Sequence, residues 1–181
     1  TDLRDGVHKA PANEIANWAQ GLTLDVTAEW QAILNPAHVN CLRQFSGRGL
    51  RVYGARTLSS NTAWRFLNVR RLLLLIEKSI SISIQWAVFE PNDFYLRQTL
   101  ILAISSFLQA LWQRGALVGS TPEEAFFVQC DEINNPPAIT EAGQLIIDVG
   151  VAPTSPAEFV VLRIGRTRDE LEITEQAGLY N

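Results

Sequence analysis

The longest regular pattern of apolar positions lies in residues 93–114. Apolar side chains recur there at steps of three and four residues: Leu96, Leu100, Ile104, Phe107, Leu108, Leu111 and Trp112. This spacing is typical of one face of an amphipathic helix, so we predict a helix and expect the positions from Leu96 to Leu111 to be buried. Asn92 and Asp93 suit its N-terminal end, and Gly115 suits its C-terminal end. At 1.5 Å per residue, such a helix spans about 33 Å.

Residues 62–84 are compatible with two periods. Apolar side chains fit one face of a helix, whereas residues 80–84 alternate isoleucine with serine as a strand does. The stretch before residue 80 is too long for one strand, so we predict a helix that ends near Ser81, with Ser60 or Asn61 as its N-cap. We expect three of its side chains to be buried: Leu73, Ile76 and Ile80.

Shorter apolar runs predict strands elsewhere. They cover Leu22–Val26, Leu50–Thr57, Trp86–Phe89, Ala125–Cys130, Gln144–Ala152 and Glu158–Ile164. A short helix that follows an N-cap at Thr27 is expected to end at Pro36, and one helical turn follows Thr121. Residues 131–143 are expected to form a loop, and residues 169–174 alternate acidic and apolar positions as an edge strand does. We therefore predict an α/β fold in which a small mixed β-sheet packs against two long α-helices.

The domain organisation is expected to be simple, because 181 residues suit one compact domain with extended arms. We predict a linker arm in residues 1–20, a domain in residues 21–164 and a C-terminal arm in residues 165–181. The first arm is expected to be extended and to contribute little to its own domain. The sequence contains no Met, so we interpret it as a C-terminal part of a longer protein.

The composition narrows the class of protein further. Uninterrupted apolar runs such as Leu72–Ile76 are far shorter than the roughly 20 residues of a transmembrane helix, so we expect no membrane insertion. No signal-peptide pattern occurs at the start. Cys41 and Cys130 are too few for a disulfide framework or a four-ligand zinc site, and we expect two reduced, half-buried thiols.

Candidate catalytic patterns are weak throughout the sequence. The chain has two histidines and no Gly-x-Ser-x-Gly elbow, and the glycines near residue 50 fit neither a dinucleotide loop nor a P-loop. Acids near Cys130 raise rather than lower a thiol pKa. The acidic pairs Glu90/Asp93 and Asp131/Glu132 match no calcium loop. We therefore predict no enzyme, no catalytic residues, no cofactor and no metal site.

Charge is distributed very unevenly along the chain. Residues 30–76 contain no acid and seven arginines: Arg43, Arg48, Arg51, Arg56, Arg65, Arg70 and Arg71. Residues 77–181 contain 14 acids against six basic residues. We expect some of these arginines to pair with acids of the C-terminal part, either within one chain or between copies that meet head to tail. Nucleic-acid binding is disfavoured by the pI of about 5.2.

An ordered series of short segments resembles one known family. The segments are Gly6–Asn13, Leu34–Pro36, Val39–Arg43, Gly47–Thr57, Asn68–Arg71, Phe89–Asn92, Phe107–Leu108, Leu111–Leu117, Glu124–Val128, Asp131–Glu132, Val149–Pro153 and Pro156–Val160. In this order they resemble the C-terminal domain of contractile tail sheath proteins. The family covers phage tails, R-type bacteriocins and extracellular contractile injection systems. The resemblance extends from about residue 6 to residue 164.

The resemblance implies a structural role. Sheath subunits form hexameric rings that stack helically around an inner tube, and their contraction drives the tube through a target envelope. The implied partners are other copies through arm-strand exchange, the inner tube, and baseplate and terminator proteins. Assembly would take place in the bacterial cytoplasm, within a phage tail or a tail-like particle. The alternatives are a sheath-like terminator or baseplate component, or an α/β hydrolase or ligand-binding domain with an unrecognised site.

The candidate contacts with other subunits or with the tube lie in two places. One set is the seven arginines of residues 30–76. The other lies in and beyond the last predicted strand: Glu158, Val160, Leu162, Arg163, Asp169, Glu170 and Glu172. We expect a strand between about residues 158 and 173 that pairs at a sheet edge, in its own chain or in a neighbour.

Overall fold

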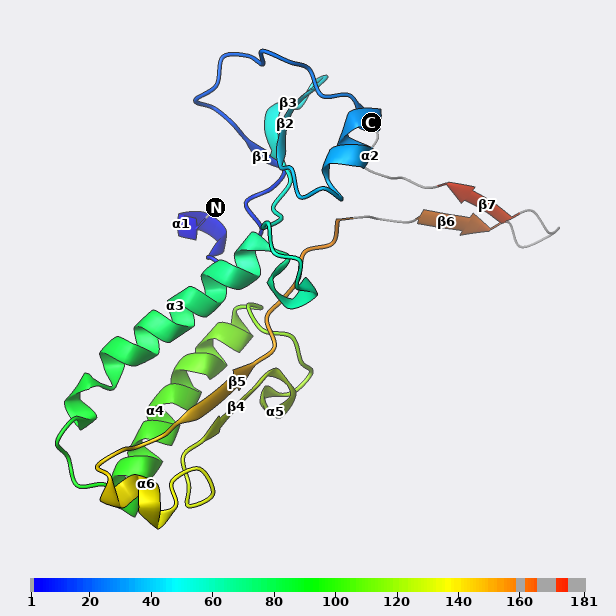
Figure 1. Cartoon of the computed structure of the whole chain (residues 1–181). Helices are drawn as coiled ribbons and strands as arrows, with labels where there is room; N and C mark the ends of the chain where they lie inside the picture. The colour runs from blue at the N-terminus through cyan, green and yellow to red at the C-terminus, as the bar shows by residue number, and fades with distance from the viewer. Residues whose placement is uncertain (1, 159–161, 166–171, 176–181) are drawn as a thin grey trace. The chain divides into compact units, whose positions relative to one another are not determined.

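The computed structural model describes residues 2–158, 162–165 and 172–175 (Figure 1). The chain divides into two compact units. The first combines Thr1–Asn68 with Ser155–Asn181, and the second is Val69–Thr154. Helices and small antiparallel sheets occur together, so the predicted α/β class is confirmed. The prediction of a single mixed sheet is wrong, because the described strands form three separate antiparallel sheets.

The first unit is built on a three-stranded sheet with the order β1–β3–β2. Strand β1 is Glu14–Ile15, β2 is Cys41–Phe45 and β3 is Gly49–Tyr53. The turn between β2 and β3 includes Gly47 with a φ of 72°, a left-handed conformation that glycine adopts without strain. Cys41, Phe45 and Tyr53 are buried on one face of this sheet, and Leu50, which lies opposite Gln44, is buried on the other face. The predicted strand at residues 50–57 therefore exists but ends at Tyr53.

The N-terminal residues contribute to this sheet, contrary to expectation. A short helix, α1, covers Asp2–Asp5, and β1 pairs with the central strand β3. The amide of Ala16 donates to the Leu50 carbonyl at 2.9 Å, and Ala16 is buried. The expectation that residues 1–20 contribute little to their own domain is therefore wrong for this segment, because β1 occupies an edge of β3.

Helix α2, Ala28–Leu34, begins where the sequence predicts. Thr27 is its N-cap, and the Thr27 hydroxyl accepts a hydrogen bond from the Trp30 amide at 3.3 Å. The expected apolar face is not the buried one, because Trp30 and Ile33 are exposed and Gln31 is buried. Gln31 Nε2 donates to the Tyr53 carbonyl at 3.3 Å, which ties the helix to β3 through a polar side chain. The strand predicted at residues 22–26 is wrong, since these residues have no regular structure.

The second unit contains the two long helices. Helix α3 covers Leu67–Ser83, α4 covers Phe94–Gln113, and strands β4, Phe126–Gln129, and β5, Asp148–Val151, form an antiparallel pair. Strand β4 packs on α4. Single helical turns occur at α5, Pro122–Ala125, and α6, Pro137–Glu141. Residues 131–143, predicted as a loop, thus include one turn, and the predicted strand at 144–152 is shorter than expected.

Helix α4 follows the sequence prediction closely. Asp93 is its N-cap and accepts a hydrogen bond from the Leu96 amide at 2.8 Å, while Asn92 is not the cap. Gly115 has a φ of 74° just after the helix, as its C-terminal position requires. The buried positions are Leu96, Leu100, Ile104, Leu108 and Leu111, and only Phe107 of the predicted set is partly exposed.

The length and composition of α4 would also allow it to span a membrane, which the short apolar runs did not indicate. One face of α4 packs inside the unit, whereas Phe94, Tyr95 and Leu102 of the same helix are exposed.

The other long helix differs in detail from the prediction. Asn61 caps a 3₁₀ turn, η1, at Thr62–Trp64, and α3 begins only at Leu67. The helical interpretation of residues 80–83 is confirmed. Of the three side chains expected to be buried, Ile76 is buried, whereas Leu73 and Ile80 are half-buried. The buried positions that the prediction missed are Val69 and Leu72.

The short strand predicted at Trp86–Phe89 is wrong. A 3₁₀ turn, η2, covers Gln85–Ala87, and the apolar side chains around it face solvent. Phe89 is fully exposed, at 102% of its reference area, and has a φ of 71°. A left-handed backbone is unusual for a bulky residue, so this turn holds Phe89 in a strained conformation.

The third sheet lies in the C-terminal part of the first unit. Strand β6, Leu162–Gly165, pairs with β7, Glu172–Glu175, so that Leu162 lies opposite Glu175 and Gly165 opposite Glu172. The expected strand between about residues 158 and 173 is confirmed, and its partner is in the same chain.

Candidate assembly surfaces

The guanidinium of Arg43 makes its contacts inside the first unit. Arg43 is buried on β2, and its Nε donates to the Val26 carbonyl at 2.9 Å. Its guanidinium carbon lies 4.9 Å from the centre of the Phe45 ring and 5.3 Å from that of Tyr53. A guanidinium over aromatic faces is stabilised by their negative quadrupole. Arg43 therefore supports the sheet from which it projects.

Two more arginines surround the turn between β2 and β3. Arg48 is exposed, and its guanidinium carbon lies 4.6 Å from the centre of the Phe45 ring. Arg51 donates from Nη1 to the Asn13 carbonyl at 2.5 Å and from Nε to the Arg48 carbonyl at 3.2 Å. Arg51 therefore connects the N-terminal segment to this turn, while its charge stays close to solvent.

Arg56 pairs with an acid of the C-terminal part, as the charge distribution predicted for some of the arginines. Arg56 Nη2 lies 2.5 Å from Glu158 Oε2, and Arg56 Nε donates to Oε1 at 2.9 Å. The guanidinium also donates from Nη1 to the Asn35 carbonyl at 3.0 Å. The Glu158 carboxylate raises the Arg56 pKa above its usual value, chiefly through these hydrogen bonds. This pair joins residues of one chain.

The other three arginines lie near the start of α3. The Arg65 carbonyl accepts from the Thr57 amide at 2.7 Å, which continues the bridge between Arg56 and Phe66. Arg70 is exposed and Arg71 is half-buried, both in the first turns of α3. The seven arginines therefore have different surroundings and are distributed over both units.

The candidates of the C-terminal arm are only partly within the described residues. Leu162 and Arg163 belong to β6, and Glu172 belongs to β7. Val160, Asp169 and Glu170 lie outside the described residues. Strands β6 and β7 pair with each other in a two-stranded sheet, and no other strand of the described part of the chain pairs with their outer edges.

A cluster of charges at the N-terminal end was not anticipated. Arg4 and Lys9 each form ion pairs with Asp5 and Glu14, at 2.7–3.0 Å. Hydrogen bonds from Arg4 and then Lys9 lower the pKa of Asp5 to about 2. The four residues span a helix, a loop and a strand, so no local sequence pattern indicates that they meet.

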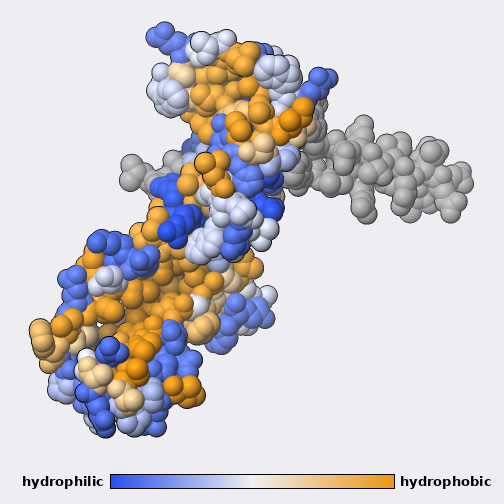
Figure 2. Space-filling model, in the orientation of Figure 1, coloured by the Kyte–Doolittle hydropathy of each residue, from blue (hydrophilic) through white to orange (hydrophobic). Residues whose placement is uncertain are grey.

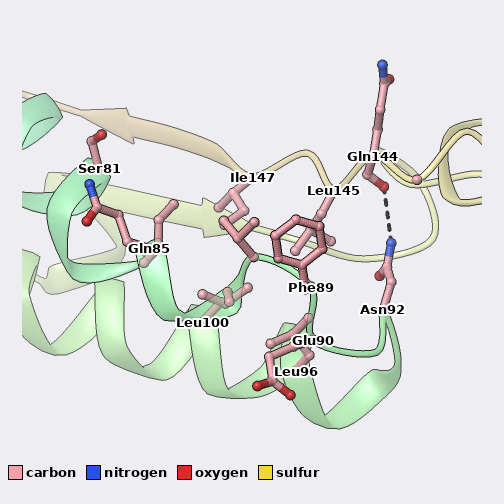
Figure 3. A pocket seen from close by; sticks show the side chains of 14 residues that line it. Ser81, Gln85, Phe89, Glu90, Asn92, Leu96, Leu100, Gln144, Leu145 and Ile147 are labelled. Atoms are coloured by element: carbon pink, nitrogen blue, oxygen red, sulfur yellow. Dashed lines mark hydrogen bonds between the residues drawn. The ribbon is translucent and has the colours of Figure 1, made fainter.

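The second unit contains an open groove of about 630 Å³ between the end of α3, the η2 turn, the start of α4 and residues 143–147. Most of its lining is apolar, with Phe89 on its wall, and Glu90 is the charged side chain among the lining residues. Asn92 joins two walls, because its Nδ2 donates to the Gln144 carbonyl at 3.1 Å (Figure 3). Asn92 Oδ1 also accepts from Arg97 Nε at 3.1 Å.

Large apolar side chains are exposed around this groove and on the adjoining helices. They include Leu74, Ile82, Trp86, Val88, Phe89, Phe94, Tyr95 and Leu102. Figure 2 shows orange, hydrophobic atoms over much of the visible face of this unit. Contiguous apolar surface of this kind is typical of a contact with another molecule.

The described residues offer little for catalysis. Residues 2–158 and the two C-terminal strands contain no cluster of three His, Cys, Asp or Glu side chains that could hold a metal ion. Cys41 and Cys130 are free and buried rather than half-buried. Burial is the main cause that raises the pKa of both thiols. Both thiols are therefore poor nucleophiles at neutral pH.

The model of the phage tail sheath C-terminal domain matches residues 59–166, which is more than half of the chain. The chain belongs to the phage tail sheath C-terminal domain family. The resemblance seen in the sequence is thereby confirmed. The matched range contains both long helices, the β4–β5 pair and β6.

Two phage tail sheath proteins are similar to this chain at 27% sequence identity. The tail sheath protein of Vibrio phage KVP40 is 27% identical over 158 residues, which are 87% of this chain and 23% of that protein. The tail sheath protein of Escherichia phage P2 is 27% identical over 168 residues, 90% of this chain and 40% of that protein.

Solved sheath structures are more similar. An extracellular contractile injection system, the PVC sheath complex in its contracted state, matches with 40% identity and a TM-score of 0.87, over 93% of this chain and 48% of that chain. The helical sheath of the anti-feeding prophage in its contracted state matches with 42% identity and a TM-score of 0.85, over 93% and 47%. The chain thus spans less than half the length of each of these sheath relatives.

Proposed function

We propose that the chain is the C-terminal domain of a structural subunit of a contractile sheath. In this proposal, subunits form hexameric rings that stack helically around an inner tube, and contraction drives the tube through a target envelope. The observation that carries the proposal is the likeness to two contracted-state sheaths, at 40% and 42% identity with TM-scores of 0.87 and 0.85. In this proposal the sheath is part of a phage tail or a tail-like particle, which is assembled in the bacterial cytoplasm.

The connection between subunits is proposed to be β-augmentation through the terminal arms. An added strand gains main-chain hydrogen bonds from an open sheet edge, so subunits stay joined while they rotate. The support is the small size of the sheets: among the described residues, β4–β5 and β6–β7 have two strands each, and no third strand pairs with either of them. Isolated two-stranded sheets are marginal in water, which favours their completion by a further strand.

The exposed apolar face of the second unit is proposed to be covered in the assembly, by a neighbouring subunit or by the tube. Phe89, Tyr95 and Leu102 are 102%, 79% and 66% exposed. Leaving such side chains in water forgoes roughly 1.5–3 kcal/mol each relative to full burial. The arginines and arm residues named from the sequence stay predicted contacts in this assembly.

The role is proposed to be non-catalytic, with energy stored in the arrangement of subunits. Partners are therefore other copies of the chain, the inner tube, and the baseplate and terminator proteins. No nucleic acid, cofactor or membrane insertion is part of this proposal.

The test is to express the full-length protein with its neighbouring tube and baseplate genes and examine purified particles by electron microscopy. The proposal expects striated sheaths of repeated rings, and contracted forms that are wider and shorter. Full-length protein that stays monomeric in the presence of assembled tubes would contradict it.

A baseplate component is the second candidate. The chain also matches a chain of the anti-feeding prophage baseplate, with 42% identity and a TM-score of 0.86 over 92% of this chain. Gold labelling of the protein in intact particles separates the two candidates, because a sheath subunit is labelled along the whole tail and a baseplate component only at one end.

A further inference from the structure

The ion pair between Arg56 and Glu158 lies where the chain enters its C-terminal segment. Pro156 precedes Glu158, and strand β6 begins shortly afterwards at Leu162. The two residues are 102 positions apart in the sequence, yet both belong to the first unit. The pair therefore closes a long loop of the chain at the start of the segment that carries β6 and β7, which is called the C-terminal arm in this subsection.

The contact has a geometry that fixes direction as well as distance. Arg56 uses Nε and Nη2 on the Glu158 carboxylate, at 2.9 Å to Oε1 and 2.5 Å to Oε2. Two parallel hydrogen bonds between planar groups hold the carboxylate in one orientation. The remaining donor, Nη1, binds the Asn35 carbonyl at 3.0 Å, just after α2. Glu158 is thus connected to the body through the guanidinium.

The backbone that carries Arg56 is itself fixed. Asn40 Oδ1 accepts from the Arg56 amide at 2.8 Å, and Asn40 Nδ2 donates to the Arg56 carbonyl at 2.7 Å. Gly54 makes room for this amide, because a Cβ there would lie 2.7 Å from Asn40 Oδ1. Arg56 also forms a bridge with Phe66. The guanidinium therefore projects from a rigid base.

Partial burial separates this pair from ordinary surface pairs. The side chains of Arg56 and Glu158 are 11% and 18% exposed, whereas those of Arg4 and Glu14 in the N-terminal cluster are 64% and 28% exposed. Exposed pairs are screened by water and contribute little. Removal of one partner from a partly buried pair leaves a charge without compensation, which is strongly unfavourable.

We propose that Arg56 and Glu158 are positioning residues that anchor the C-terminal arm to its own subunit. The anchor sets the direction in which the arm leaves the body and carries the load when the arm is pulled during contraction. The inference rests on the proposed function, since it assumes that the arm pairs with a neighbouring subunit. It also assigns these two residues to a contact within the subunit instead of a contact between subunits.

The test uses the full-length protein with its tube and baseplate partners and three variants: E158Q, R56K, and the exchanged pair R56E/E158R. E14Q, which removes one carboxylate from the N-terminal cluster, is the matched control. Amide hydrogen exchange is measured on unassembled subunits, with peptides that cover Ser155–Gly165 compared with peptides from β2 and β3. Electron microscopy then counts intact and contracted sheaths.

The anchor predicts that E158Q and R56K raise exchange in Ser155–Gly165 by about tenfold, as expected for loss of a hydrogen bond to a charged group. Exchange in β2 and β3 should change by less than about twofold, and the yield of contracted sheaths should fall several-fold. The exchanged pair should recover part of both losses, because it restores opposite charges. E14Q should behave as the unchanged protein. R56K keeps the charge and serves as the variant that folds if E158Q does not.

Three results would overturn the anchor. Unchanged exchange in Ser155–Gly165 would show that the pair does not hold the arm. An equal rise in β2 and β3 would show that the pair only stabilises the first unit. A loosened segment with normal sheath yield and contraction would refute the mechanical role. If the unchanged protein forms no sheath, the proposed function fails, and the exchange data still decide whether the arm is anchored.

Discussion

Replacement of Leu108 by Ala tests the packing of α4 most directly. Leu108 has 0% of its surface exposed, and it lies on the buried face of the helix. Shortening it deletes three carbon atoms from a site that no water reaches. The free energy of unfolding should fall by about 2–5 kcal/mol, because the substitution removes the transfer free energy of these atoms and leaves a cavity.

Leu102 provides the matched control, because it lies on the same helix and is 66% exposed. The same substitution there leaves no cavity, and Ala is at least as good a helix former as Leu. We therefore expect Leu102→Ala to change the free energy of unfolding by less than about 0.5 kcal/mol. The two variants differ only in which face of α4 they alter.

The assay is urea unfolding of the chain, followed by far-UV circular dichroism and by tryptophan fluorescence. Leu108→Ala should lower the midpoint while the slope stays unchanged, which reports a loss of stability in the same transition. Equal effects of the two substitutions would refute the assignment of the buried face. A large decrease in stability for Leu102→Ala alone would show that the opposite face of α4 is the buried one.

Three further predictions concern local contacts. Asp93→Ala should lower the free energy of unfolding by about 1 kcal/mol, because it removes the cap of α4, and hydrogen exchange should show fraying of the first turn. The pKa of Asp5 is lowered to about 2, so Asp5 stabilises the fold above its ordinary pKa, and this stabilisation should disappear as the pH falls towards 2. When the free energy of unfolding is measured against pH, D5N should remove this contribution. Cys41 and Cys130 should react with a thiol reagent only at the rate of opening, and fast labelling of the folded chain would contradict their burial.

The sequence predicts α4 well because its signals are local and agree with one another. An apolar face repeats over five turns, Asp93 lies at the start, and Gly115 lies at the end. The α5 turn after Thr121 was found for the same reason, since a Pro at the first helical position is a local signal. Long periodic elements with terminal signals need no information about the rest of the chain.

The failures have a common physical cause. Trp86–Phe89 was predicted as a buried strand because its residues are apolar, and periodicity does not distinguish a core from an exposed apolar surface. In α2, the buried residue is Gln31, since its amide reaches the Tyr53 carbonyl 22 positions away. Contacts between distant segments decide both cases, and no local pattern contains them.

The candidate contacts show the same limit. The absence of acids between residues 30 and 76 predicted that some arginines pair with acids of the C-terminal part, and among the described residues Arg56 pairs with Glu158. The pattern did not indicate which arginine would pair. It also did not anticipate that Arg43 would instead lie over the aromatic rings of Phe45 and Tyr53.

The most direct test of the central claim is a helical reconstruction by cryo-electron microscopy of particles made with the full-length protein. The account predicts that residues 59–166 recur in every subunit of the sheath, on the side that faces the tube, with a strand from a neighbouring subunit added to one of the two-stranded sheets. A particle whose sheath is built from another protein, with this chain at one end only or missing, would contradict it.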